Sequence, residues 1–139
     1  LNNRIDERIV LDTPEKTAEY LMPKFFGKMT ECVCMVPMDD KKRPMGCIFL
    51  SEGIVNGAPI SVAQMVKEAV RTHASTILLA HNHPRGLPLP SSDDIGTTIA
   101  VSRALEVVNI RLTDHLIIAD NDYCSMRRHY PNAFRSDGL

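Results

Sequence analysis

The sequence predicts a layered α/β domain in which helices cover both faces of a mixed β-sheet. Stretches with helical periodicity alternate with short strands, an order typical of a three-layer α-β-α arrangement. After their first residues, the segments 31–38 and 76–80 are apolar at successive positions, as in strands that are covered on both sides. Apparent hairpins add antiparallel pairs, so the sheet should be mixed. The length of 139 residues and the 44% apolar content suit one core, so residues 1–139 are expected to form a single domain.

Residues 1–27 are predicted to be an N-terminal helical segment. Thr13 offers a capping hydroxyl, and Pro14 follows at the first helical position. Apolar residues then recur at helical spacing, although Pro23 is expected to break or kink the helix early. Gly27 is expected to end it.

A hairpin and a second helix are expected next. Residues 31–38 and 47–50 have the pattern of two strands joined by a polar turn. Ser61 begins the clearest helix, residues 61–71, with a capping-box pattern and one apolar stripe. A short apolar strand at residues 76–80 follows.

The last third of the chain is expected to hold one helix and two strands. The helix begins at Ser91 or Ser92, and the strands cover residues 111–119 and 123–126, with a turn between them. Residues 127–139 are polar and are expected to be a loosely docked tail.

Charge, hydropathy and cysteine spacing exclude several classes of protein. The net charge is −1, so no broad basic surface for nucleic acid or an anionic membrane is expected. No apolar run approaches the ~18 residues that a membrane span needs, and the first residues lack the layout of a secretion signal. The four cysteines have no CxxC spacing and are expected to be reduced and mostly buried. These features predict a cytoplasmic protein that does not associate with a membrane.

Two histidines directly follow the second buried strand. His81 and His83 are two residues apart, so their imidazoles project to the same side of an extended chain. Two neutral imidazoles in this arrangement can share a zinc ion, and a catalytic zinc usually has three protein ligands and one open position. Asp93 and Asp94 lie beyond a proline-containing loop in the first helical turn, with Asp94 three residues after Ser91. The spacing favours a metal site with a carboxylate from this turn as the third ligand.

Each part of this pattern also has a simpler explanation. Ser91-x-x-Asp94 is a capping-box pattern, and an isolated HxH is more often a coincidence than a pair of ligands. An apolar strand followed by HNHP, six residues and SxxD is much rarer by chance than its parts. The joint pattern therefore favours the metal.

The segment from His81 to Asp94 resembles the JAMM signature HxHP-x6-SxxD of the JAB/MPN metalloproteases. The strings HNHPRG, PSSDDI and LTDHLIIAD are more similar still to the RadC-type branch, whose members are often labelled DNA-repair proteins. The resemblance covers residues 10–126. It implies the JAB/MPN fold, which is cytidine deaminase-like, and a catalytic zinc held by His81, His83 and Asp94.

The resemblance also implies roles for two further residues. In the family, a glutamate on an upstream strand binds the zinc water and acts as general base, and a serine helps to stabilise the oxyanion. These roles are assigned to Glu31, at the start of a strand covered on both sides, and to Ser91. Glu52 and Glu68 remain alternatives for the base, and Glu31 taken alone would be a solvated charge at a strand end.

The roles of two further residues stay open. His115 is either a support for the metal site or a satisfied structural histidine. Arg85 stands where RadC-type sequences usually have serine. The presence of Arg85 at this position concerns contacts with the substrate and leaves the inferred metal ligands unchanged.

The function that the resemblance implies is that of a zinc metallohydrolase, a metallopeptidase that cuts peptide or isopeptide bonds in a peptide or protein substrate. The family label offers a DNA-repair factor or metal-dependent nuclease as an alternative, although the near-neutral charge gives nucleic acid no electrostatic support. A non-catalytic interaction module is a third hypothesis. A nucleobase deaminase is disfavoured because the chain has no PCxxC ligand pair. The sequence identifies neither the physiological substrate nor the oligomeric state.

Overall fold

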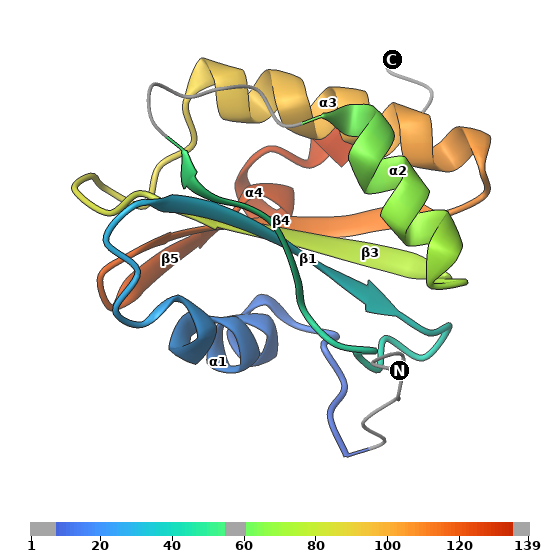
Figure 1. Ribbon diagram of the computed structural model, residues 1–139, viewed down its shortest axis with the longest axis horizontal. Coiled ribbons are helices and arrows are strands. Elements are labelled where there is room, and N and C mark those ends of the chain that lie inside the picture. The colour runs from blue at the N-terminus through green and yellow to red at the C-terminus, as the bar shows by residue number, and fades with distance from the viewer. Residues whose placement is uncertain (1–7, 55–60, 135–139) are drawn as a thin grey trace.

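A mixed five-stranded sheet with helices on both faces forms the centre of the domain (Figure 1). The computed structural model describes residues 8–54 and 61–134, and only the backbone within residues 51–54. The predicted α/β class is confirmed. In chain order the elements are α1 (Pro14–Phe25), β1 (Glu31–Met38), β2 (Ile48–Ile54), α2 (Val62–Arg71), β3 (Thr76–Asn82), α3 (Ser92–Val107), β4 (Arg111–Ala119), β5 (Asp122–Ser125), α4 (Met126–His129) and the 3-10 helix η1 (Pro131–Phe134).

The strand order β2-β1-β3-β4-β5 determines where the two histidines lie. β1 is antiparallel to β2 and to β3, and β5 is antiparallel to β4. β3 and β4 are parallel, so the chain between them must cross over, and α3 makes this crossover. The carboxyl end of β3 therefore leads through one loop to the N-terminus of α3.

Two apolar cores lie on the two faces of the sheet. Successive side chains of a strand point to opposite faces, so Ile77 and Leu79 pack in one core, and Leu78 and Ala80 pack in the other. The first core lies under α2 and α3, and the second under α1 (Figure 1). This arrangement confirms the three predicted layers.

The first helix does not break at Pro23, so that prediction is wrong. α1 continues to Phe25, and the Phe26 N–H donates to the Pro23 carbonyl oxygen at 3.2 Å. A proline in the last turn removes only one helical hydrogen bond, so the helix tolerates it there. Gly27 follows with φ +80°, a left-handed conformation that favours glycine and ends the helix.

The segment predicted as a loosely docked polar tail is packed as far as residue 134. α4 and η1 lie against the core under α3, and Met126, Ala133 and Phe134 are buried. Residues 135–139 lie outside the described residues. The prediction counted polar residues in this segment, whereas docking depends on the few apolar ones, which cover surface that α3 and β4 leave open.

The four cysteines are free, as predicted, with Cys32, Cys34 and Cys124 buried and Cys47 half-buried. Within residues 8–54 and 61–134, none of the helices has the length and apolar composition to cross a bilayer.

Candidate metal centre

The two histidines lie at the carboxyl end of β3. This strand extends to Asn82, two residues beyond the predicted end, because His81 pairs with Ile117 of β4 and Asn82 pairs with Ile118. His83 follows directly, and its N–H donates to the Ile118 carbonyl oxygen at 2.7 Å. The His81 side chain is buried and that of His83 is half-buried. The sheet therefore holds both imidazole-bearing residues by their backbones.

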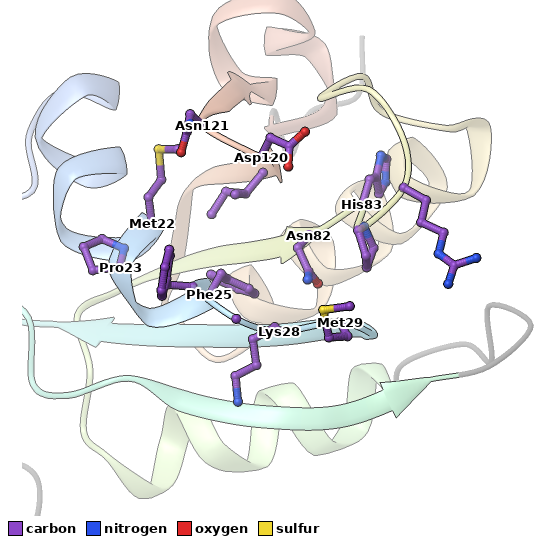
Figure 2. A pocket seen from close by; sticks show the side chains of 14 residues that line it. Met22, Pro23, Phe25, Lys28, Met29, Asn82, His83, Asp120 and Asn121 are labelled. Carbon is purple, nitrogen blue, oxygen red and sulfur yellow. The ribbon is translucent and has the colours of Figure 1, made fainter.

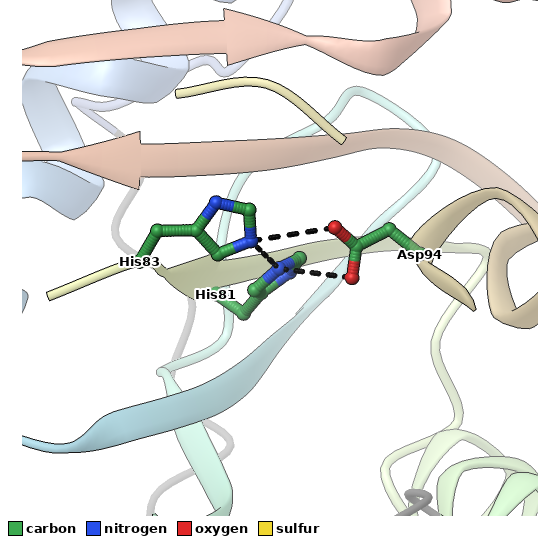
Figure 3. A group of neighbouring side chains, drawn as sticks. All are labelled: His81, His83 and Asp94. Atoms are coloured by element: carbon green, nitrogen blue, oxygen red, sulfur yellow. Dashed lines mark hydrogen bonds and ion pairs between the residues drawn. The ribbon is translucent and has the colours of Figure 1, made fainter. Parts of the chain in front are cut away.

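The imidazoles of His81 and His83 meet the carboxylate of Asp94, as the sequence predicts (Figure 3). The two Nε2 atoms are 3.0 Å apart. Oδ1 of Asp94 lies 3.2 Å from Nε2 of His81, and Oδ2 lies 3.3 Å from Nε2 of His83. These three residues could hold a metal ion between them.

The first turn of α3 holds the carboxylate of Asp94 in place. Ser91 caps the helix through its Oγ, which accepts a hydrogen bond from the Asp94 N–H at 3.0 Å. Oδ2 of Asp94 accepts in return from the Ser91 N–H at 2.7 Å, which completes a capping box. The helix cap is therefore present, and it is compatible with a metal site because the cap itself orients the carboxylate toward the histidines.

The protonation of His83 follows from its second ring nitrogen. Nδ1 of His83 lies 2.9 Å from the carbonyl oxygen of Leu87. A carbonyl oxygen can only accept, so Nδ1 carries the proton in this bond. In the neutral ring, Nε2 then presents a lone pair to His81 and Asp94.

His81 is held in the same tautomer by a chain of hydrogen bonds that ends at a backbone carbonyl. The Thr98 hydroxyl donates to the Asp94 carbonyl oxygen at 2.7 Å, so it must accept from Nδ1 of His115, also at 2.7 Å. Nε2 of His115 is then left as an acceptor, and it receives the Nδ1 proton of His81 at 2.7 Å. Nε2 of neutral His81 is consequently a lone pair as well.

Four acceptors therefore converge on one point: two imidazole lone pairs and both oxygens of the Asp94 carboxylate. Acceptors at such distances repel one another unless a cation or added protons lie between them. Two ligand atoms on one tetrahedral zinc ion, each bonded at about 2.0–2.1 Å, are about 3.3 to 3.4 Å apart. The distance of 3.0 Å between the two Nε2 atoms, and those of 3.2 and 3.3 Å from each Nε2 to a different oxygen of Asp94, are close to this spacing.

The pKa shifts within the group describe the alternative in which added protons, and not a cation, lie between the acceptors. Burial alone would raise the pKa of Asp94, but bonds to His81 and His83 hold that pKa well below its usual range. The bond to Asp94 in turn raises the pKa of His83. Burial, with a further contribution from His81, lowers the pKa of His115 well below its usual value. His115 is therefore neutral at physiological pH, as the hydrogen-bond chain requires.

Glu31 lies across the strand pair from the histidines. Val33 of β1 pairs with His81 in an antiparallel register, which brings Glu31, two residues earlier, alongside His83. The negative charge of Glu31 contributes to the raised pKa of His83, as expected of a nearby carboxylate. The carboxylate of Glu31 thus lies at the same end of the sheet as the three groups that could hold a metal ion.

Asn82, between the two histidines, fixes the backbone on both sides of Glu31. Its Oδ1 accepts from the Cys32 N–H at 2.6 Å, and its Nδ2 donates to the Thr30 carbonyl oxygen at 3.2 Å. Asn82 itself is buried. One side chain of the HNH segment therefore holds the strand end that carries Glu31.

Glu68 and Glu52 are the two alternatives to Glu31 for the general base. Glu68 on α2 is engaged by Arg71, whose guanidinium lies 2.8 Å from its carboxylate. The side chain of Glu52 lies outside the described residues.

Sequence reasoning missed Asn82 and Thr98 and left the role of His115 open. Strand alternation could have placed Asn82 on the opposite face from His81, but its partner at the start of β1 is 50 residues away. For His115, the sequence offers only its position directly after Asp114 in a strand.

The fold and the site define a class: a three-layer α/β domain with a His-His-Asp group where a sheet strand meets a helix N-terminus. The family model for the RadC-like JAB domain matches residues 11–131. The chain belongs to this family, as its sequence motifs predict.

The chain is similar to curated proteins that are named UPF0758. It is 37% identical over 114 residues to one from Carboxydothermus hydrogenoformans, an alignment that covers 82% of this chain and 50% of that protein. It is 35% identical over 119 residues to one from Bordetella avium, covering 86% of this chain and 53% of that protein. The chain thus spans about half the length of these relatives.

Proposed function

We propose that this domain is a zinc-dependent hydrolase that cuts amide bonds in peptides or proteins, including isopeptide bonds. The convergence of two imidazole lone pairs and a carboxylate at one half-buried point carries the proposal. His81, His83 and Asp94 would be the protein ligands, a set that leaves a tetrahedral ion one open position. Bound zinc supplies a Lewis acid that polarises a carbonyl group and makes water nucleophilic near neutral pH.

Glu31 is the proposed general base. Its carboxylate would take a proton from the attacking water as the water oxygen bonds to the carbonyl carbon. The same carboxylate would pass this proton to the amide nitrogen as the carbon–nitrogen bond breaks, leaving a carboxylate and an amine. The position of Glu31 beside His83 and the hold of Asn82 on its backbone support this role.

Ser91 is the proposed donor to the oxyanion. Its Oγ accepts in the helix cap, so the cap does not consume the hydroxyl proton. A hydroxyl that can donate toward the carbonyl oxygen stabilises the negative charge that develops there during the attack. The position of Ser91 at the N-terminus of α3 adds the positive end of the helix dipole.

The experiment that tests the proposal measures metal content and amide hydrolysis on the same protein. The protein is loaded with zinc, its zinc content is measured by mass spectrometry, and it is incubated with a peptide library made from a digested proteome. We expect one zinc ion per chain and the appearance of new peptide termini. Glu31→Gln should keep the zinc and lose cleavage by at least about a hundredfold, since general-base catalysis contributes 10²–10⁴-fold.

Two matched variants identify the base. Glu52→Gln and Glu68→Gln make the same change at the competing positions and should leave cleavage within about twofold of the unmodified protein. Loss of cleavage in either of these variants and not in Glu31→Gln would assign the base elsewhere. A protein that binds zinc but cuts no peptide, and that cuts or nicks DNA in the same buffer, would favour the nuclease alternative.

A further inference from the structure

We call His81, His83 and Asp94 together the metal group. A pocket of about 660 Å³ lies beside it, on the face of the sheet that α1 covers (Figure 2). We call it the α1 pocket. Its walls come from the end of α1 and the loop after it, from the segment 82–85 after β3, and from the turn between β4 and β5. Its volume lies within the 300–1,000 Å³ that small-ligand sites usually have.

One wall of the α1 pocket is apolar. Met22 and Phe25 of α1 and Ile118 of β4 line it, and Phe25 and Ile118 are themselves buried in the core on this face. Rigid core residues of this kind give the pocket a fixed shape. Removal of apolar surface from water into such a site is favourable in proportion to the area buried.

Two large apolar side chains stand unburied at the entrance. Phe26 is 90% exposed and Met29 is 81% exposed, and both line the α1 pocket. These two side chains remain in water in the folded protein, whereas the neighbouring Phe25 is buried in the core. Apolar side chains that cluster around a concave site are typical of surfaces that bind a partner.

His83 joins the α1 pocket to the metal group. The same side chain lines the pocket and directs its Nε2 toward Asp94. A molecule with its carbonyl group at the metal position would therefore reach the pocket past the ring of His83. Consecutive side chains of an extended peptide are ~3.3–3.6 Å apart along the chain, so a residue next to the reacting bond is the one that would enter.

The charges at the entrance favour a peptide over a nucleic acid. Lys28 and Arg85 are cationic and Asp120 is anionic, so the charged side chains that line the pocket leave a net charge of only about +1. A phosphate backbone needs an uncompensated positive surface, whereas a neutral peptide backbone with an apolar side chain does not.

We propose that the α1 pocket receives a large apolar side chain, of the size of leucine, methionine or phenylalanine, from the residue next to the amide bond that is cut. This inference rests on the proposed function. It assigns to the protein a preference for peptide substrates with such a residue on one side of the scissile bond.

The experiment measures the binding of small hydroxamates, which chelate a catalytic zinc, by titration calorimetry on zinc-loaded protein. One series consists of the hydroxamates of acetyl-glycine, acetyl-leucine and acetyl-phenylalanine, which place the side chain on the acyl side. The other consists of succinyl hydroxamates with hydrogen or an isobutyl group on the carbon that mimics the amine-side residue. In one series we expect the apolar member to bind at least tenfold more tightly than the member without a side chain.

Substitutions at Phe26 and Met29 should not disturb folding, because both side chains are exposed. Phe26→Asp combined with Met29→Asp should reduce this tenfold preference to less than threefold, with the affinity for acetyl-glycine hydroxamate unchanged. Val107→Asp is the matched control, because Val107 is 86% exposed at the end of α3 and does not line the pocket. The control should keep the full preference.

The outcomes separate the pocket from the metal. Equal affinities within both series, with tight binding of all members, would overturn the α1 pocket and leave the zinc site standing. Failure of every hydroxamate to bind a protein that holds zinc would overturn the proposed function and the pocket together. Binding of a thymidine oligonucleotide that is lost in the Phe26 and Met29 double variant would assign the pocket to nucleic acid and contradict the inference.

Discussion

Two aspartates, the half-buried Asp94 and the buried Asp114, differ in what surrounds their carboxylates. Asp114 accepts from the N–H groups of His115 and Arg127 at 2.7 and 3.0 Å, and from the Ser125 hydroxyl at 2.7 Å. Every one of these neighbours is a donor. Asp94 also accepts from one backbone N–H, but its two oxygens face imidazole nitrogens whose tautomers leave lone pairs.

The difference shows which polar cluster is complete by itself. A carboxylate with three donors is satisfied within the protein and fixes local structure, here the start of α4 against β4. A carboxylate opposite two lone pairs is balanced only when a cation or added protons join the cluster. The first network is therefore expected to serve stability and the second to bind metal, and variants of each should show different effects.

The largest expected effect is stabilisation of the protein by zinc. At a free zinc concentration of 1,000 times Kd, binding to the folded state adds about 4 kcal/mol to the free energy of unfolding. Asp94→Asn should lose most of this gain, because an amide replaces the anionic ligand, and should keep the helix cap. Asp93→Asn, an exposed neighbour, is the control. Urea unfolding with and without zinc measures both, and an equal gain in Asp94→Asn would contradict the assignment.

A smaller loss of stability is expected at Asp114, and it should not depend on zinc. Asp114→Ala leaves three donors without an acceptor and should cost about 2 to 4 kcal/mol of unfolding free energy. Asp114→Asn keeps an acceptor for the two N–H groups, and the Ser125 hydroxyl can rotate to accept, so it should cost less than about 1 kcal/mol. Zinc affinity should stay within about threefold in both. A large loss of zinc affinity would show that the two networks are one.

The pH dependence of stability distinguishes the unmodified protein from Asp114→Asn. Burial raises the pKa of Asp114 above the usual value for an aspartate. A raised pKa in the folded state means that folding favours the protonated acid, so this contribution is complete below the unfolded pKa and is lost as pH rises through the folded one. The stability of the unmodified protein relative to Asp114→Asn should therefore increase as pH falls from 7 toward 4. A relative stability that falls over this range would contradict the burial effect.

His115 should affect zinc binding through His81 and not through contact with the ion. His115→Phe removes the acceptor that holds the Nδ1 proton of His81, and partners of this kind typically contribute ten- to hundredfold to metal affinity. Thr98→Val removes the next hydroxyl in the chain and should cost less. Competition with a chromophoric chelator measures the affinities. An affinity within twofold for His115→Phe would show that the chain of hydrogen bonds does not set the tautomer.

Asn82 should affect the rate and not the metal. Asn82→Ala frees the backbone on both sides of Glu31 and should lower the cleavage rate about tenfold, with zinc affinity within about threefold. The rate is measured on a peptide identified in the library digest. Asn82→Asp keeps the acceptor for the Cys32 N–H and should retain more activity. An unchanged rate in Asn82→Ala would remove the assigned link to Glu31.

The proximity of His81, His83 and Asp94 can be predicted from the sequence because the three residues lie in one short segment. A strand end, a loop and a helix start bring His81, His83 and Asp94 together by local geometry alone. The supporting contacts are not local: His115 is 34 residues from His81, and Asn82 reaches Cys32 across 50 residues. Strand alternation predicts a face of the sheet, but the partner on that face depends on the strand order.

The C-terminal segment was misjudged for a related physical reason. Its composition is polar, yet Ala133 and Phe134 are buried in the core that also contains residues of α3 and β4. Only the three-dimensional arrangement shows that these two residues pack there. The α1 pocket was likewise invisible, since its walls come from three separate parts of the chain.

X-ray absorption at the zinc edge of the zinc-loaded protein tests the central claim most directly. The account predicts only nitrogen and oxygen ligands at about 2.0–2.1 Å, with the outer-shell pattern of two imidazoles. A zinc–sulfur distance of about 2.3 Å would instead place the metal on cysteines such as Cys34 and Cys47, and would contradict the assignment of His81, His83 and Asp94.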